Sequence, residues 1–153
     1  MAALDRRPVS VIGAGIGGLT CALALARRGA RVTVQERAPA LTDVGAGIQV
    51  PPNAVRVLDA LGLGPAIDAA SLRNPSVQLN DDQGRRVLRM DLISHRPTAR
   101  FLLIHRARLI EVLADAARAA GVSLTLGHEV ETPPDGPLVI GAEGLKSPLR
   151  RAL

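Results

Sequence analysis

Aromatic side chains are nearly absent from this sequence of 153 residues, which has one Phe, Phe101, and neither Trp nor Tyr. A folded core must therefore be built from aliphatic side chains, and the hydrophobic content of 47% is enough for one. The same shortage excludes the stacked aromatic platform on which single-strand nucleic-acid binders hold bases. The one long apolar run, residues 9–26, contains four glycines that weaken a hydrophobic helix, so we do not interpret it as a secretory signal. No other run approaches the ~20 residues of a membrane span, and we expect no membrane partner.

Cysteine and lysine are equally scarce, with one residue of each, Cys21 and Lys146. A lone cysteine forms no intrachain disulfide and fits a reducing compartment, so we expect a cytoplasmic protein. Three isolated histidines and one cysteine do not predict a metal site. The formal net charge is +5, and the arginines occur as pairs scattered along the chain, which indicates a solvated surface and no nucleic-acid partner: Arg6–Arg7, Arg27–Arg28, Arg85–Arg86 and Arg150–Arg151.

Hydrophobic periodicity predicts strands that alternate with helices. Glycine and proline positions end these elements, and Pro51–Pro52 and Gly62 bound one of the helices. That helix has a predicted apolar face of Val55, Val57, Leu58 and Leu61. The pattern predicts an α/β fold with a mostly parallel sheet and a small β-hairpin, in a single domain of residues 1–153. The elements we expect are strands at 8–12, 31–35, 101–104, 122–126 and 138–141, helices at 19–28, 51–61 and 106–120, a hairpin at 76–90, and loops at 37–50 and 131–137.

The strongest motif lies between the first predicted strand and the first predicted helix: Gly13-Ala14-Gly15-Ile16-Gly17-Gly18. In a G-x-G-x-x-G turn the first glycine allows the tight turn, the second lets the backbone approach a pyrophosphate, and the third lets helix and strand pack closely. The following helix presents free N–H groups to the phosphates. Glu36 directly follows the second predicted strand, where an acid would bond ribose hydroxyls. Arg37 could lie over the adenine, meet a phosphate or remain solvated. The pattern alone leaves NAD and FAD both open.

Four blocks of sequence resemble the single-component flavoprotein aromatic hydroxylases, near their salicylate hydroxylase-like branch. They are VIGAGIGGLTCALALARRGARVTVQER at 11–37, VGAGIQVPPNAVRVLDALGL at 44–63, HRARLIEVLADAA at 105–117 and LVIGAEGLKSPLRR at 138–151. The blocks follow the family order and span nearly the whole chain. The resemblance implies that FAD is the cofactor, that NADH or NADPH reduces it in a complete enzyme, and that the substrate is a small aromatic compound.

The resemblance also implies roles for individual positions. Residues Gly13 to Gly18 would hold the pyrophosphate, and Glu36 the ribose. The loop with Gly47 and Ile48 would lie near the flavin ring or ribityl chain, and Arg106 near the ribityl phosphate. The remaining cofactor positions would be Val130, whose backbone meets the adenine, and Glu143 with Gly144, on the pyrophosphate side. No catalytic residue is predicted.

Three departures from the family pattern indicate an incomplete enzyme. Glu143 stands where the family has aspartate. Only ETPPDGP separates the GHEV segment at 127–130 from the last block, where the family usually has several strands. Family members are also much longer. We therefore expect a truncated FAD-binding part that is not active alone. Two alternatives stay open, a non-catalytic remnant without cofactor and one half of a split oxygenase that a second polypeptide completes. An NAD-dependent dehydrogenase would need a catalytic residue that we do not find.

Overall fold

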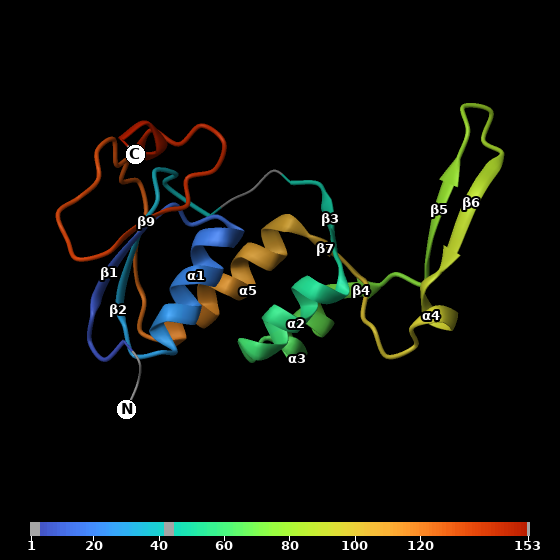
Figure 1. Ribbon diagram of the computed structural model, residues 1–153, viewed down its shortest axis with the longest axis horizontal. Helices are drawn as coiled ribbons and strands as arrows, with labels where there is room; N and C mark the ends of the chain where they lie inside the picture. Colours follow the sequence, from blue (N-terminus) through green and yellow to red (C-terminus); the bar gives the residue numbers. More distant parts are fainter. Residues whose placement is uncertain (1–3, 42–44, 153) are drawn as a thin grey trace. The chain divides into compact units, whose positions relative to one another are not determined.

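The structure is a computed structural model that describes residues 4–41 and 45–152. The chain divides into two compact units (Figure 1). Unit 1 comprises Met1–Val44 and Ala107–Leu153, and unit 2 comprises Gly45–Arg106. We describe each unit separately. None of the described helices is long and apolar enough to cross a membrane.

Unit 1 is built on a parallel sheet of four strands in the order β8-β2-β1-β9. These strands are β1 (Pro8–Ile12), β2 (Arg31–Gln35), β8 (Ser123–Thr125) and β9 (Val139–Gly141). All four were predicted from the sequence, the last two with slightly longer bounds. Because every pair is parallel, the carboxyl ends of all four strands lie along one edge of the sheet. That edge carries the candidate site described below.

Two helices contribute apolar side chains to the core of unit 1, beside those of the strands. They are α1 (Ile16–Ala26) and α5 (Arg106–Ala119), of which α5 agrees with the prediction to one residue. Helix α1 begins earlier than the predicted 19–28, because the glycine turn itself contains the first residues of the helix. The core is aliphatic, as the composition requires: Val9, Val11, Val32 and Val34 from the strands, Leu19 and Leu23 from α1, and Leu109, Ile110 and Leu113 from α5.

Unit 2 contains an antiparallel sheet of three strands in the order β3-β7-β4. These are β3 (Gly47–Val50), β4 (Ser71–Arg73) and β7 (Leu102–His105). The predicted loop at 37–50 was therefore wrong for its last four residues. Strand β3 exists because its backbone pairs with β7, more than fifty residues later in the chain, and no local pattern reveals such a partner. Residues 42–44 of the predicted loop lie outside the described residues.

Helices α2 (Pro52–Ala60) and α3 (Gly64–Ala70) follow β3. The proline start of α2 was predicted, whereas α3, β4 and the short α4 (Leu92–His95) were not. Val57 was wrongly placed on the apolar face, since 51% of it is exposed while Val55, Leu58 and Leu61 are buried. Val57 lies two residues from Val55, about 200° around the helix, so both cannot face the core.

The predicted hairpin is present in unit 2 as β5 (Ser76–Asn80) and β6 (Arg86–Asp91). Its turn contains the DDQG sequence that indicated it, and Gly84 there has a positive φ of 78°. In unit 1, residues 126–138 connect β8 to β9 with no helix or strand, in agreement with the loop predicted at 131–137. A 3-10 helix, Leu149–Ala152, follows β9 and was not predicted.

Candidate functional site

The glycine turn between β1 and α1 has a geometry that other residues could not adopt at two positions. Gly13 has φ of 105°, and a Cβ there would lie 2.6 Å from the Ala142 carbonyl oxygen. A Cβ on Gly18 would lie only 1.9 Å from the Gly13 carbonyl oxygen. Such contacts are shorter than any real Cβ makes, so close packing of helix and strand requires glycine here.

Gly15 differs from both neighbours, because a Cβ there would meet no atom within 4 Å. It is the N-cap of α1, and no side chain bonds the first N–H groups of that helix. These groups and the positive end of the helix dipole therefore face open space beside the turn. That combination suits an anionic group such as a pyrophosphate. Ala14, Ile16 and Gly17 complete the turn, and Gly17 also has open space at its Cβ position.

The Glu36 side chain reaches back to this turn from the end of β2. Its Oε2 accepts a hydrogen bond of 2.7 Å from the Ala14 N–H, and its Oε1 accepts one of 2.9 Å from the Ala38 N–H. Gly13 N–H donates to the Gln35 carbonyl at 2.7 Å, which holds the turn against β2. The sequence spacing of acid and glycines is thus realised as direct contact. The carboxylate is fixed where a ribose would lie if a phosphate occupied the turn.

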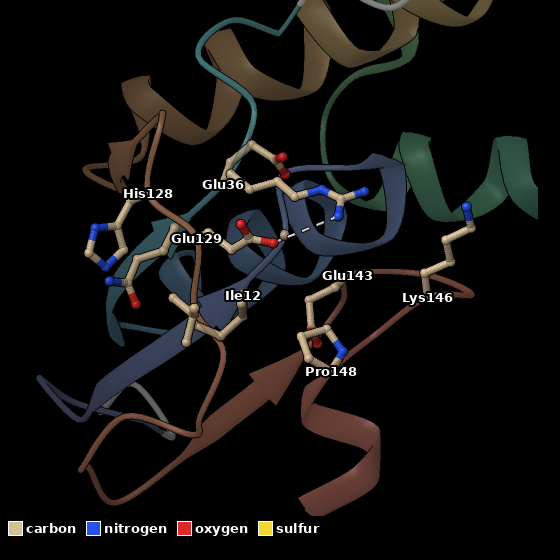
Figure 2. A pocket seen from close by; sticks show the side chains of 11 residues that line it. Ile12, Glu36, His128, Glu129, Glu143, Lys146 and Pro148 are labelled. Atoms are coloured by element: carbon tan, nitrogen blue, oxygen red, sulfur yellow. Dashed lines mark ion pairs between the residues drawn. The ribbon is translucent and has the colours of Figure 1, made fainter.

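A pocket opens at the carboxyl edge of the parallel sheet, and Figure 2 shows the side chains that line it. Its walls come from the ends of β1 and β2 and from the segments after β8 and β9. The His128 N–H donates to the Glu36 carbonyl at 2.9 Å and so holds the segment after β8 against the end of β2. The eleven lining residues are Ile12, Gly13, Gln35, Glu36, Arg37, His128, Glu129, Val130, Glu143, Lys146 and Pro148.

Two charged side chains meet across the pocket, Arg37 and Glu129, with 3.9 Å between Arg37 Nη1 and Glu129 Oε1 (Figure 2). Their side chains are 65% and 60% exposed, so the pair contributes little to stability. It does hold the planar Arg37 guanidinium at the pocket. The Lys146 side chain, in contrast, extends away from the other labelled side chains in Figure 2.

Glu143, the residue that departs from the family aspartate, is bonded within its own segment. Its Oε2 accepts from Ser147 Oγ at 2.9 Å, and its Oε1 accepts from the Leu149 N–H at 3.4 Å. A Cβ on Gly141 would lie 2.8 Å from Glu143 Oε2, so the longer side chain fits because residue 141 is glycine. The Glu143 carboxylate therefore organises the turn before the 3-10 helix. Gly144 has φ of 82° and lines a neighbouring pocket with Glu143.

The residues predicted from the sequence thus fall into two groups. Gly13, Glu36, Arg37, Val130 and Glu143 line one pocket, with the rest of the glycine turn beside it. The other group lies in unit 2, where Gly47 and Ile48 of β3 pair with β7, and the Arg106 N–H donates to the Ala46 carbonyl at 3.4 Å.

Sequence reasoning missed six residues of the pocket wall. Most of them directly adjoin a predicted site residue or lie in the fourth block, residues 138–151. A search of the residues next to each predicted site position would have found these. His128 was set aside because nothing in the sequence linked it to the site. The missed residues are Ile12, Gln35, His128, Glu129, Lys146 and Pro148.

Fold and site together define a dinucleotide-binding α/β protein of the Rossmann type. The glycine cradle that a Cβ would fill, the open end of α1 and the fixed Glu36 carboxylate fit an adenine dinucleotide. A comparison with protein families matches residues 6–137 to the FAD-binding domain. The chain belongs to this family, and its cofactor is FAD.

Curated relatives include a probable synthase, a monooxygenase and a hydroxylase. A probable 2-heptyl-3-hydroxy-4(1H)-quinolone synthase of Rhodococcus erythropolis is 37% identical over 96% of this chain and 41% of its own length. A 3-amino-4-hydroxybenzoate 2-monooxygenase of Streptomyces cremeus is 37% identical over 95% of this chain and 41% of its own length. The 3-hydroxybenzoate 6-hydroxylase 1 of Aquipseudomonas alcaligenes is 34% identical over 94% of the chain and 42% of its own length.

Among solved structures, the tetrameric form of 2-methyl-3-hydroxypyridine-5-carboxylic acid oxygenase is similar with a TM-score of 0.87 and 26% identity. The likeness covers 96% of this chain and 42% of that one. The chain therefore spans about two fifths of the length of the proteins it resembles. This places its 153 residues in correspondence with the FAD-binding portion of aromatic hydroxylase-type monooxygenases.

Proposed function

We propose that this chain holds the adenosine-diphosphate half of FAD in unit 1 and forms part of a monooxygenase that hydroxylates small aromatic compounds. The observation that carries the proposal is the contact between Glu36 and the glycine turn inside one pocket with Val130 and Glu143. The relatives that are named as a hydroxybenzoate hydroxylase and an aminohydroxybenzoate monooxygenase support the aromatic substrate class.

In this proposal the backbone N–H groups at the start of α1 hold the pyrophosphate, and the Gly13 to Gly18 turn admits it. The Glu36 carboxylate accepts hydrogen bonds from the ribose hydroxyls and repels a 2′-phosphate at that position. The Val130 backbone bonds the adenine edge, and the Arg37 guanidinium covers the adenine face. Glu143 acts by shaping the turn that carries Gly144 to the pyrophosphate side.

Gly47, Ile48 and Arg106 remain predicted flavin and ribityl positions that rest on the sequence resemblance. Bound FAD would supply the redox chemistry, with electrons from NADH or NADPH and an oxygen atom from O₂. The protein's part is to bind and orient that group and to keep water from it. The chain spans about two fifths of the length of its relatives, and we propose that its 153 residues do not turn over substrate alone.

Absorbance spectra of the purified chain after addition of FAD and removal of free cofactor test the binding step. Charged hydrogen bonds contribute about 1.5–3 kcal/mol, so Glu36→Ala should weaken FAD binding roughly 10- to 150-fold. Glu111→Ala, an exposed glutamate of α5, is the matched control and should retain the flavin spectrum. FMN lacks the adenosine portion, and retention of FMN as firmly as FAD would contradict the proposed site.

Turnover is tested separately with NADH or NADPH and simple phenols. Robust hydroxylated product from the isolated chain would refute its incompleteness. A colourless chain that takes up no FAD would instead favour a non-catalytic remnant. The second polypeptide of a split oxygenase stays a prediction that no comparison supports, and the cytoplasmic location stays a prediction from the single cysteine.

A further inference from the structure

Two arginine pairs that are distant in the sequence meet in unit 1. Three backbone hydrogen bonds of 2.8–3.2 Å join residues 4–7 to residues 28–31, and β1 pairs with β2 from their first residues. The sequence indicated scattered pairs, and the fold gathers two of the four at one end of the sheet. The segments can be followed in Figure 1 from the start of β1 and from the end of α1. We call the following five residues the arginine edge: Arg6, Arg7, Arg27, Arg28 and Arg31.

The arginine edge gathers five exposed arginines in two adjoining segments. All five of its residues are exposed, and within the described part of the chain none of them forms an ion pair. Asp5 is the one acid in the segments that form the edge. Elsewhere in the described residues, Arg37, Arg100 and Arg108 are among the arginines that pair with a carboxylate. Single exposed arginines such as Arg56 and Arg86 form no ion pair there either, so the edge is marked by the number of such arginines that adjoin one another.

The end of helix α1 explains why two of the five arginines are where they are, but it does not explain the other three. Arg27 and Arg28 follow the last residues of α1, where cations favour the helix dipole, and Arg28 Nη1 donates to the Ala24 carbonyl at 3.3 Å. Arg6, Arg7 and Arg31 belong to a turn and to strand starts, where no dipole attracts them. Like charges gathered without counter-charge destabilise the compact state. An anionic partner would remove that repulsion.

Although the sequence led us to expect no membrane partner, we propose that the arginine edge docks unit 1 on an anionic phospholipid surface. Guanidinium groups bond phosphate oxygens in pairs, which suits a surface of lipid phosphates. A nucleic acid fits less well, because the edge offers no aromatic side chain for stacking and the five residues form one compact end rather than a stripe. The edge lies at the amino ends of β1 and β2, whereas the cofactor pocket lies at their carboxyl ends, so docking leaves the pocket open.

Sedimentation of the full chain with vesicles tests this docking, independently of whether the pocket binds FAD. Vesicles of phosphatidylcholine containing about 30% phosphatidylglycerol should carry the chain down, and pure phosphatidylcholine should not. Salt should release it, because the attraction is screened within a Debye length. Each arginine near such a surface contributes roughly a fivefold gain, so Arg7→Gln with Arg31→Gln should lower partitioning roughly 30-fold.

Arg86→Gln with Arg89→Gln removes the same charge from β6 in unit 2 and serves as the matched control, because within the described residues these exposed arginines form no ion pair either. Equal losses in both double variants would mean that net charge alone binds the vesicles, which overturns the proposal. Absence of sedimentation with anionic vesicles, or tighter binding to a DNA duplex than to them, overturns it as well. Circular dichroism checks that each variant folds. If the first does not, Arg6→Gln with Arg27→Gln replaces it, and its partitioning decides the same question.

Discussion

Gly18→Ala should lower the stability of the fold, whereas Gly15→Ala should weaken FAD binding, although both positions belong to the same glycine turn. A Cβ at position 18 would lie 1.9 Å from the Gly13 carbonyl oxygen, which is a backbone atom. Gly13 cannot withdraw, since its own Cβ position is 2.6 Å from the Ala142 carbonyl oxygen. The helix must therefore move away from the sheet. At position 15 no atom lies within 4 Å of the Cβ, and φ of −72° suits alanine.

The expected magnitudes follow from these contacts. Overpacking of this kind costs about 1–3 kcal/mol, so Gly18→Ala should lower the melting temperature by roughly 2–12 °C. Gly15→Ala should change the free energy of unfolding by less than about 1 kcal/mol. Its methyl group would nevertheless enter the open space beside the start of α1, where we place the pyrophosphate. We therefore expect it to lose FAD binding while it keeps its stability.

Thermal unfolding in the absence of FAD measures the first effect, and titration with FAD measures the second. The reasoning would be refuted if Gly15→Ala proved the less stable of the two variants. It would also be refuted if Gly15→Ala bound FAD as tightly as the unchanged chain, because the pyrophosphate would then not occupy the open space beside Gly15. Gly17→Ala, whose Cβ also meets nothing, tests how far that space extends.

Three further predictions concern packing and charge. Leu113→Ala removes a fully buried side chain of α5 and should lower the free energy of unfolding by about 2–5 kcal/mol, measured by urea denaturation. Arg100 bonds an aspartate of α2 and an aspartate of α3, and its side chain is 26% exposed. Arg100→Leu should therefore destabilise the chain by about 1 kcal/mol, with a smaller loss at high salt, and an unchanged denaturation midpoint would contradict this. The pKa of Asp91 lies below its ordinary value of 3.8, chiefly because its carboxylate accepts a hydrogen bond from the Ser94 N–H. A carboxyl group whose pKa is lower in the folded chain stabilises the fold above its unfolded-state pKa, and this stabilisation is lost as the pH falls through its folded-state pKa. The NMR amide signals of α4 should therefore shift below about pH 4, and Asp91→Asn should abolish that shift.

The sequence alone predicted the parts of the molecule that depend on neighbouring residues. Strands β1 and β2 and helix α5 follow from hydrophobic periodicity, and the hairpin follows from the DDQG turn between alternating segments. Strand β3 was missed because its four residues become a strand only when they pair with β7. Val57 was misplaced because a list of apolar residues near a helix does not say which of them face the core.

The candidate site divides in the same way. The glycine turn and Glu36 could be predicted, because the tight turn and the acid at the next strand end lie within one βαβ unit. His128 could not be predicted, because it reaches the pocket only through the placement of β8 beside β2, whereas Glu129 adjoins the predicted Val130. Glu143 looked like a misfit in the sequence, and only the space beside Gly141 shows how the longer side chain is accommodated.

By itself, then, the sequence determined the strands and helices of unit 1, the aliphatic core and the dinucleotide turn, since periodicity and glycine geometry act over a few residues. Tertiary structure alone decided which strand ends share the pocket and that two arginine pairs meet at the opposite end of the sheet. Such meetings depend on strand order and register, which arise from packing between segments far apart in the chain.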